Sequence, residues 1–273
     1  MILKLITVLS LVLAVLGGFS GNFFLIPVYF AGHFLALFLL AILYCLVICA
    51  FVDMQKEAET DSPFYRANMY LYVEFLMNVL RVKVTATGLE KIPTDGRFLL
   101  VCNHQHMADP GILLHFFKGS QLAFISKKEN EKLPVINKFL HMTLCQSIER
   151  DNDRQGLKVI LKCIQLIKED QVSIAVFPEG GTNHDSLVHP FRPGAFKIAQ
   201  KARVPIVVCT MNGTEPLFRN LKTYKQTPVR LNLVDVIPAQ ELEGQTTTQI
   251  ADRVYEMMIA DLGEEFRAKE ENQ

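Results

Sequence analysis

A chain of 273 residues can hold one large domain or two small ones, and its 28 basic and 28 acidic side chains leave no formal net charge. Nucleic-acid-binding proteins usually carry a basic excess, so this balance argues against a nucleic-acid partner. The charges are unevenly placed, because Lys4 is the only Asp, Glu, Lys or Arg between Met1 and Val52. The composition therefore predicts a membrane segment, residues 1–52, joined to a globular domain.

Two apolar stretches make up this membrane segment, Met1 to Phe19 and Phe23 to Val52. The second has thirty residues without an acidic or basic side chain, and about twenty suffice to cross a bilayer core. Ser20-Gly21-Asn22 between them is a turn signal. The pattern predicts a helical hairpin that either spans the membrane or is re-entrant. A cleaved signal peptide followed by an anchor is the alternative.

The charges flanking the hairpin predict its orientation. Lys4 lies at one open end, Lys56 and Arg66 follow the other, and the turn carries no cation. By the positive-inside rule, both ends and the domain that follows face the cytoplasm. The cysteines agree with this, because they lie in apolar surroundings without CxxC spacing and are expected to be reduced. They are Cys45, Cys49, Cys102, Cys145, Cys163 and Cys209.

Residues 53–80 read as a polar linker followed by an amphipathic helix. Ser62-Pro63 opens the helix, which runs to about Leu80. Arg66, Glu74 and Asn78 are spaced to share one narrow polar face, with apolar side chains around the rest. Such a helix lies either in a core or at the membrane interface, and we favour the interface because the helix directly follows the anchor.

From Arg81 onward, predicted strands and helices alternate, which is typical of an α/β fold with a mostly parallel sheet flanked by helices. The predicted strands are Val82 to Thr87, Phe98 to Cys102, Leu122 to Ser126, Cys145 to Glu149, Val172 to Phe177, Ile206 to Met211 and Val229 to Val236. The predicted helices are Pro110 to Phe117, Glu129 to Met142, Asp153 to Lys168, Ala195 to Ala202 and Thr247 to Ala268.

A histidine and an aspartate lie at the end of the second predicted strand. His104 follows the apolar run ending at Cys102, and Asp109-Pro110 reads as the N-cap and first residue of the next helix. In one continuous helix, residues five apart would point about 140° away from each other, so only a turn lets these side chains meet. A carboxylate that holds one imidazole nitrogen leaves the other free to act as a general base.

Other polar residues follow neighbouring strands. Arg150 comes after the strand ending at Glu149, and Glu179-Gly180-Gly181 comes after the strand ending at Phe177. Ligands of parallel sheets gather outside the carboxyl ends of the strands, so we expect these residues to share a pocket with His104.

The order of several short motifs resembles that of the PlsC-type glycerolipid acyltransferases, the family that includes 1-acylglycerol-3-phosphate acyltransferases. Each motif is short, and their common order and spacing carry the resemblance over about Arg81 to Asn212. The motifs are Asn103-His104-x4-Asp109, Ser126-Lys127-Lys128-Glu129, Ile148-Glu149-Arg150, Phe177-Pro178-Glu179-Gly180 and Val204-Pro205-Ile206-Val207, the last preceded by Arg192-Pro193-Gly194-Ala195-Phe196. On this resemblance, residues 81–273 form an acyltransferase domain.

The resemblance implies acyl transfer to lysophosphatidic acid, giving phosphatidic acid, without a metal or cofactor. His104, oriented by Asp109, would deprotonate a glycerol hydroxyl that attacks the thioester of acyl-CoA or acyl carrier protein. Arg150 and Lys127 would hold the acceptor's phosphate, and Glu179 would bind the glycerol hydroxyl or fix the loop. Backbone N–H groups of Gly180 and Gly181 could form a nest for the phosphate or the carbonyl oxygen.

One motif departs from the family pattern. Where the family reads Glu-Gly-Thr-Arg, this chain reads Glu179-Gly180-Gly181-Thr182-Asn183-His184, so a Gly is inserted and the Arg is missing. Arg192 is a candidate substitute. The change makes another lysolipid or a glycerol phosphate acceptor an alternative to lysophosphatidic acid.

Two alternative hypotheses assign the chain to other classes of protein. His104-x-His106 with Asp109, joined by His141, His184 or His189, could bind a metal in a hydrolase. A non-catalytic membrane scaffold that keeps the fold is the third reading. The intact His/Asp pair argues against the scaffold, and the altered Glu-Gly-Gly motif keeps it open.

Overall fold

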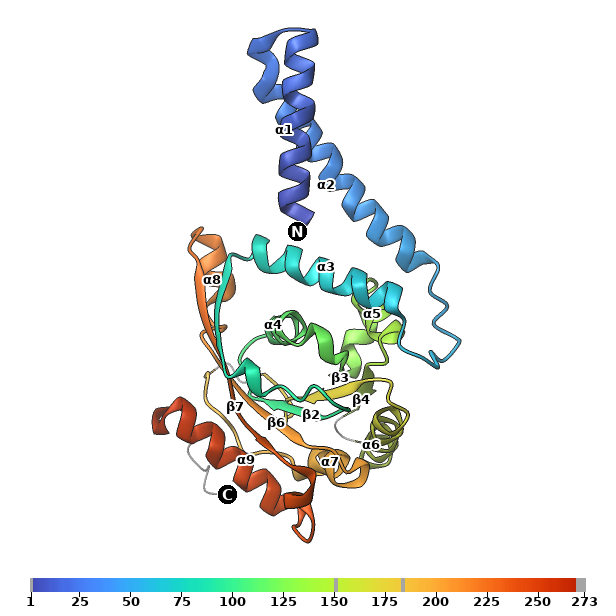
Figure 1. Cartoon of the computed structure of the whole chain (residues 1–273), viewed down its shortest axis with the longest axis vertical. Helices are drawn as coiled ribbons and strands as arrows, with labels where there is room; N and C mark the ends of the chain where they lie inside the picture. Colours follow the sequence, from blue (N-terminus) through green and yellow to red (C-terminus); the bar gives the residue numbers. More distant parts are fainter. Residues whose placement is uncertain (1, 150–151, 183–184, 269–273) are drawn as a thin grey trace.

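The computed structural model describes residues 2–149, 152–182 and 185–268. It has a helical hairpin that stands away from an α/β domain (Figure 1). The hairpin consists of α1 (Ile2–Ser20), a short 3₁₀ turn (Phe23–Leu25) and α2 (Ile26–Ala50). At 1.5 Å per residue these two helices are about 28 and 37 Å long, against a bilayer core of about 30 Å. Both are long and apolar enough to cross a membrane, as predicted.

Small side chains let the two hairpin helices approach closely. Ser10, Ala14 and Gly18 are buried at four-residue intervals along α1. A Cβ added to Gly18 would lie 2.4 Å from Cγ1 of Ile26, so this close approach requires glycine. Most of the larger apolar side chains of the hairpin point outward, for example Leu5, Leu16 and Leu39. This distribution fits a hairpin that packs on itself and faces lipid.

The domain is built on one seven-stranded sheet in the order β1-β7-β6-β2-β5-β3-β4. All neighbours pair in parallel except β6 and β7. The α/β fold with a mostly parallel sheet is therefore confirmed. The strands are β1 (Val82–Thr87), β2 (Leu99–Cys102), β3 (Leu122–Lys127), β4 (Gln146–Ile148), β5 (Ser173–Val176), β6 (Ile206–Asn212) and β7 (Thr227–Ile237).

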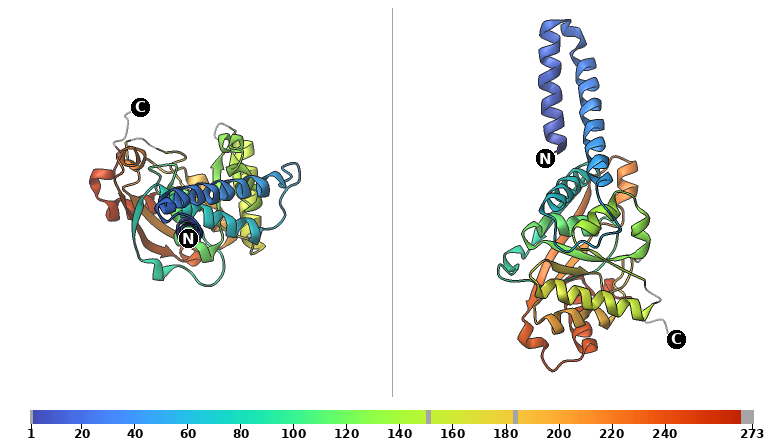
Figure 2. Two further views of the ribbon diagram at one scale, coloured as in Figure 1. Left: turned by 90° about the horizontal axis from the view of Figure 1, so that it is seen from above. Right: turned by 90° about the vertical axis from the view of Figure 1, so that its right-hand side faces the viewer.

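Helices cover both faces of the sheet and form two buried cores with it. On the hairpin side lie α3 (Pro63–Val79), α4 (Asp109–Phe116) and α5 (Ile136–Met142), and on the opposite side α6 (Asp153–Lys168), α7 (Lys197–Ala202) and α9 (Thr247–Leu262) (Figures 1 and 2). All six cysteines are free, as predicted.

Several helix boundaries differ from prediction. The helix expected over 129–142 is split into a 3₁₀ turn (Lys128–Lys132) and α5, because Pro134 cannot continue a helix. The C-terminal helix ends at Leu262, where Gly263 has φ +114°. The short helix α8 (Leu217–Lys222) was not predicted.

The expected polar face of α3 is wrong for one of its three residues. Arg66 is only 3% exposed. Its guanidinium donates to the Asp61 carboxylate and to the carbonyls of Leu122 and Thr143. A buried cation needs such partners, so this side of α3 faces the domain. The interfacial location of the opposite side stays a prediction.

Candidate active site

His104 and Asp109 meet across the loop between β2 and α4. His104 Nδ1 lies 2.8 Å from Asp109 Oδ2, and the Asp109 carboxylate is fully buried. The same oxygen accepts the backbone N–H groups of Gln105 and His106, each at 2.8 Å. The loop therefore closes around one carboxylate oxygen, which also holds the imidazole.

Asp109 does not cap the helix as predicted. Ala108 is the N-cap, and Asp109 is the first residue of α4. Its carboxylate turns back onto the preceding loop, because it serves three donors there instead of the first free N–H groups of the helix.

The imidazole of His104 is also held from one side. Its ring stacks on Phe177, with centroids 4.0 Å apart and planes 17° from parallel. Among the described residues, no group forms a hydrogen bond with Nε2. Because Nδ1 faces a carboxylate, the proton of a neutral ring belongs on Nδ1, and Nε2 is left as the acceptor. The side chain is thus arranged as a base.

Glu179 joins the His104 loop to the loop that follows β5. Its Oε1 accepts the backbone N–H of His104 at 2.8 Å, and its Oε2 accepts that of His189 at 3.1 Å. Of the two roles expected for Glu179, this geometry supports fixing the loop. The Glu179 carboxylate thereby fixes the backbone of His104 relative to the loop that follows β5.

The two glycines after Glu179 differ in what they offer a ligand. Gly180 has φ +80°, and its N–H already donates to the carbonyl of Phe177. The N–H of Gly181 has no acceptor within the part of the chain that the structure describes. Of the expected nest, the amide of Gly181 is the one available to a substrate oxygen.

Arg192 lies directly against this turn. A Cβ on Gly180 would come within 2.8 Å of Arg192 Nε, and the backbone N–H of Arg192 donates to Pro178 at 2.9 Å. The side chain is exposed, and its guanidinium pairs with no carboxylate among the described residues. An exposed cation therefore lies against the turn that follows Glu179.

The remaining predicted cations are Lys127 and Arg150. Lys127 is exposed at the end of β3, and its ammonium group has no partner in the described ranges. Its neighbour Lys128 pairs with Glu149 at 3.3 Å. Arg150 lies outside the described residues. Since β3 runs parallel to β5, Lys127 stands at the same edge of the sheet as the residues that follow β5.

Two neighbours of His104 hold its loop against β6, and we assigned them no role from the sequence. The side-chain amide of Asn103 pairs with the backbone of Met211, donating to its carbonyl and accepting its N–H, both at 2.8 Å. Gln105 accepts the N–H of Gly213 at 3.0 Å. Their place beside His104 in the motif was the available signal, but their partners are more than 100 residues away.

The metal reading lacks its ligand set among the described residues. His106 Nδ1 accepts the N–H of Ala108 at 3.2 Å, and burial lowers the pKa of this imidazole. His189 Nε2 pairs with Asp185 at 2.8 Å. The described residues contain no group of three His, Cys, Asp or Glu side chains placed to hold an ion. His184, also named for such a site, lies outside them.

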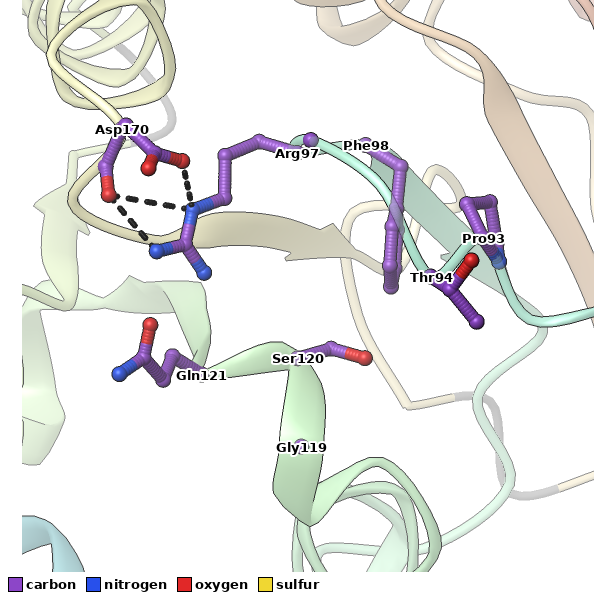
Figure 3. A pocket seen from close by; sticks show the side chains of 9 residues that line it. Pro93, Thr94, Arg97, Phe98, Gly119, Ser120, Gln121 and Asp170 are labelled. Atoms are coloured by element: carbon purple, nitrogen blue, oxygen red, sulfur yellow. Dashed lines mark hydrogen bonds and ion pairs between the residues drawn. The ribbon is translucent and has the colours of Figure 1, made fainter.

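A hollow of about 270 Å³ lies at the other end of the sheet, near the start of β2 (Figure 3). Arg97 crosses it and is held by Asp170, whose carboxylate and carbonyl both accept from the guanidinium. Ligands of parallel sheets bind at the carboxyl ends of the strands, so we place the candidate site at the end of the sheet that carries His104.

Comparisons with known proteins identify relatives of the part of the chain that contains this site. A family model described as Acyltransferase matches residues 83–212, which include His104, Asp109, Glu179 and Arg192. Over 166 residues the chain is 35% identical to a chloroplastic 1-acyl-sn-glycerol-3-phosphate acyltransferase of Brassica napus, covering 57% of this chain and 47% of the relative. These matches support the assignment of the chain to the PlsC-type glycerolipid acyltransferases.

Other relatives with lower identity match over greater lengths. The human 1-acyl-sn-glycerol-3-phosphate acyltransferase alpha is 26% identical, over 88% of this chain and 81% of the relative. The crystal structure of the 1-acyl-sn-glycerophosphate acyltransferase PlsC from Thermotoga maritima shares the fold, with TM-score 0.61 and 22% identity over 98% of this chain and all of that one. The match spans about half the length of the Brassica napus relative, and 45% of a 1-acyl-sn-glycerol-3-phosphate acyltransferase of Chlamydomonas reinhardtii that is 33% identical.

Proposed function

We propose that this protein moves a fatty acyl group from an acyl thioester to the free hydroxyl of lysophosphatidic acid, giving phosphatidic acid in phospholipid biosynthesis. The observation that carries the proposal is the His104–Asp109 pair at 2.8 Å, at the carboxyl edge of the sheet, within the matched family region. The names of the relatives, which are 1-acyl-sn-glycerol-3-phosphate acyltransferases, supply the acceptor.

His104 acts as the general base in this proposal. Nε2 takes the proton of the glycerol hydroxyl as its oxygen attacks the carbonyl carbon of the thioester. The resulting tetrahedral intermediate collapses, the C–S bond breaks, and the thiolate leaves with the proton that His104 had accepted. Asp109 stabilises the imidazolium between these steps through its bond to Nδ1. No covalent enzyme intermediate is needed, because a thiolate is a good leaving group.

Three groups around the base are assigned to the substrates. Arg192 and Lys127 bind the phosphate of the acceptor, Arg192 with several donors and Lys127 as a point charge. The N–H of Gly181 faces no acceptor in the described chain and is assigned to the oxyanion or to a phosphate oxygen. Arg150 keeps its assigned role in phosphate binding as a prediction from sequence.

The altered Glu-Gly-Gly motif supports a second candidate acceptor. If Arg192 does not replace the missing Arg, a lysolipid without a phosphate monoester becomes the better substrate. The donor is acyl-CoA or acyl carrier protein in either case.

An acceptor panel tests the proposal. Membranes containing the wild type or His104→Ala receive one labelled acyl-CoA and a series of lysolipids and glycerol phosphate. We expect labelled phosphatidic acid from lysophosphatidic acid with the wild type only. Equal product from both proteins would refute the mechanism, and product from a different lysolipid alone would replace the acceptor.

The proposed location is the cytoplasmic face of the membrane, with the hairpin as anchor. A Ser20→Cys variant at the hairpin turn is labelled in sealed cells to test this. Labelling by a membrane-impermeant reagent from outside is expected for a spanning hairpin. Labelling only from inside contradicts the orientation.

A further inference from the structure

The segment after β6 presents cations and aromatic rings on one exposed surface. Leu217 is buried and anchors α8, whereas Phe218 is 48% exposed and Tyr224, just after the helix, is 78% exposed. Arg81 extends this surface, because its guanidinium lies 5.2 Å from the centre of the Tyr224 ring. We call this surface the α8 surface; it consists of Arg81, Phe218, Arg219, Lys222, Tyr224 and Lys225.

The α8 surface is strongly basic. Four of its six residues are cations, and the acidic residue paired with it is Glu215, 3.3 Å from Arg219. Lysine, arginine and aromatic side chains together are typical of segments that lie at a membrane–water interface, because aromatic rings enter the headgroup region and cations meet lipid phosphates.

The location of α8 matches that of a membrane contact. Both side views place α8 on the hairpin side of the domain, level with α3 (Figures 1 and 2). The hydroxyls of Tyr72 and Tyr65 in α3 donate to the carbonyls of Ala41 and Ile48, within the last ten residues of α2. Helix α3 therefore lies where α2 leaves the bilayer, and α8 lies at a similar depth.

The α8 surface also adjoins the candidate active site. The ring of Phe218 contacts His106 edge-on, with centroids 4.7 Å apart. His106 belongs to the loop that Asp109 closes around His104. Phe218 thus contacts a residue that is two positions from the proposed base.

We infer that the α8 surface is a second membrane contact, in which Phe218 and Tyr224 enter the headgroup region and the four cations bind the phosphates of an anionic bilayer. The second contact holds the His104 loop against the lipid surface. The inference builds on the proposed membrane anchoring but does not require any particular acceptor.

Tryptophan fluorescence tests the contact directly, because the chain has no tryptophan. Phe218→Trp and Tyr224→Trp each introduce one reporter into the full-length protein, reconstituted in phosphatidylcholine vesicles with and without phosphatidylglycerol. Leu161→Trp is the control, since Leu161 is 56% exposed on α6, on the opposite side of the domain. We expect lipids with brominated acyl chains to quench both reporters at least twofold more than the control. Equal quenching of all three would overturn the inference.

Charge reversal tests the role of the cations. Arg219→Glu, Lys222→Glu and Lys225→Glu are combined in the Tyr224→Trp background, with Lys158→Glu, Lys168→Glu and Lys201→Glu as the matched control. We expect phosphatidylglycerol to increase quenching in the control set and not in the α8 set. Unchanged dependence on phosphatidylglycerol in the α8 set would refute anionic-lipid binding. Quenching needs no turnover, so its outcome is independent of whether lysophosphatidic acid proves to be the acceptor.

Discussion

The backbone N–H of His104 donates to Oε1 of Glu179 at 2.8 Å, although the two residues are 75 positions apart in the chain. The other oxygen of the same carboxylate accepts the N–H of His189. Glu179 therefore spans two loops, and Asp109 holds the imidazole within one of them. The position of the proposed base depends on carboxylates at both its backbone and its ring.

Replacing Glu179 with Gln tests this positioning role. The amide can still accept one backbone N–H but offers a donor to the other, so one loop contact is lost. A lost buried hydrogen bond costs about 1–3 kcal/mol, which predicts a kcat roughly 10- to 100-fold lower. Steady-state kinetics should show this fall with little change in KM for lysophosphatidic acid. A rise in KM with unchanged kcat would instead assign Glu179 to acceptor binding.

Removing the base itself should have a larger effect. His104→Ala is expected to lower the acyl-transfer rate by about 10² to 10⁴, the usual contribution of a general base. Asp109→Asn should also lower kcat, because an amide can present its N–H to Nδ1 and favour the wrong tautomer. His106→Ala is the matched control in the same loop and should retain most of the activity. A His104→Ala protein with near-normal turnover would contradict the mechanism.

The sequence predicted the sheet and the His104–Asp109 pair for the same physical reason. The runs at β2 and β5 are apolar because both faces of these strands are buried, so strand and polar loop are distinguishable in the sequence. Helix α8 could not be predicted in this way, because six residues with three apolar positions show no helical period. The helical periodicity of α3 was visible in the sequence. The hydrogen bonds from Arg66 to carbonyls 56 and 77 residues away were not.

The contacts that hold the site were the least predictable part. Glu179, Asn103 and Gln105 act through bonds to residues distant in the chain, and no local pattern encodes such partners. The contact of Asp109 with His104 was predicted correctly, whereas its predicted position as the N-cap of the helix was wrong. An Asp before Pro is compatible with both positions, and only the loop geometry decides which N–H groups it receives.

The burial of the His106 imidazole predicts that the stability of the protein depends on pH. Burial lowers its pKa below that of the unfolded chain, so the unfolded state binds a proton more readily. The contribution of His106 to stability is therefore fully present above the unfolded pKa and is lost as the pH falls from there toward the folded pKa. His106→Gln should reduce the fall in Tm between about pH 7 and pH 5. An unchanged Tm profile would mean that other groups dominate in this range.

Arg192 provides the sharpest test of the acceptor. Its guanidinium lies against Gly180 and has no carboxylate partner in the described chain, so Arg192→Gln removes a positive charge from the site without breaking an ion pair there. A hydrogen bond to a charged group contributes about 1.5–3 kcal/mol, which predicts a KM for lysophosphatidic acid roughly 10- to 150-fold higher with kcat little changed. Arg253→Gln, which breaks a surface pair with Glu241, is the control and should leave KM unaltered. The same measurement with a lysolipid that lacks a phosphate monoester should show a smaller rise. If KM for lysophosphatidic acid does not change, the headgroup is bound elsewhere, and Lys127→Gln becomes the next variant to measure.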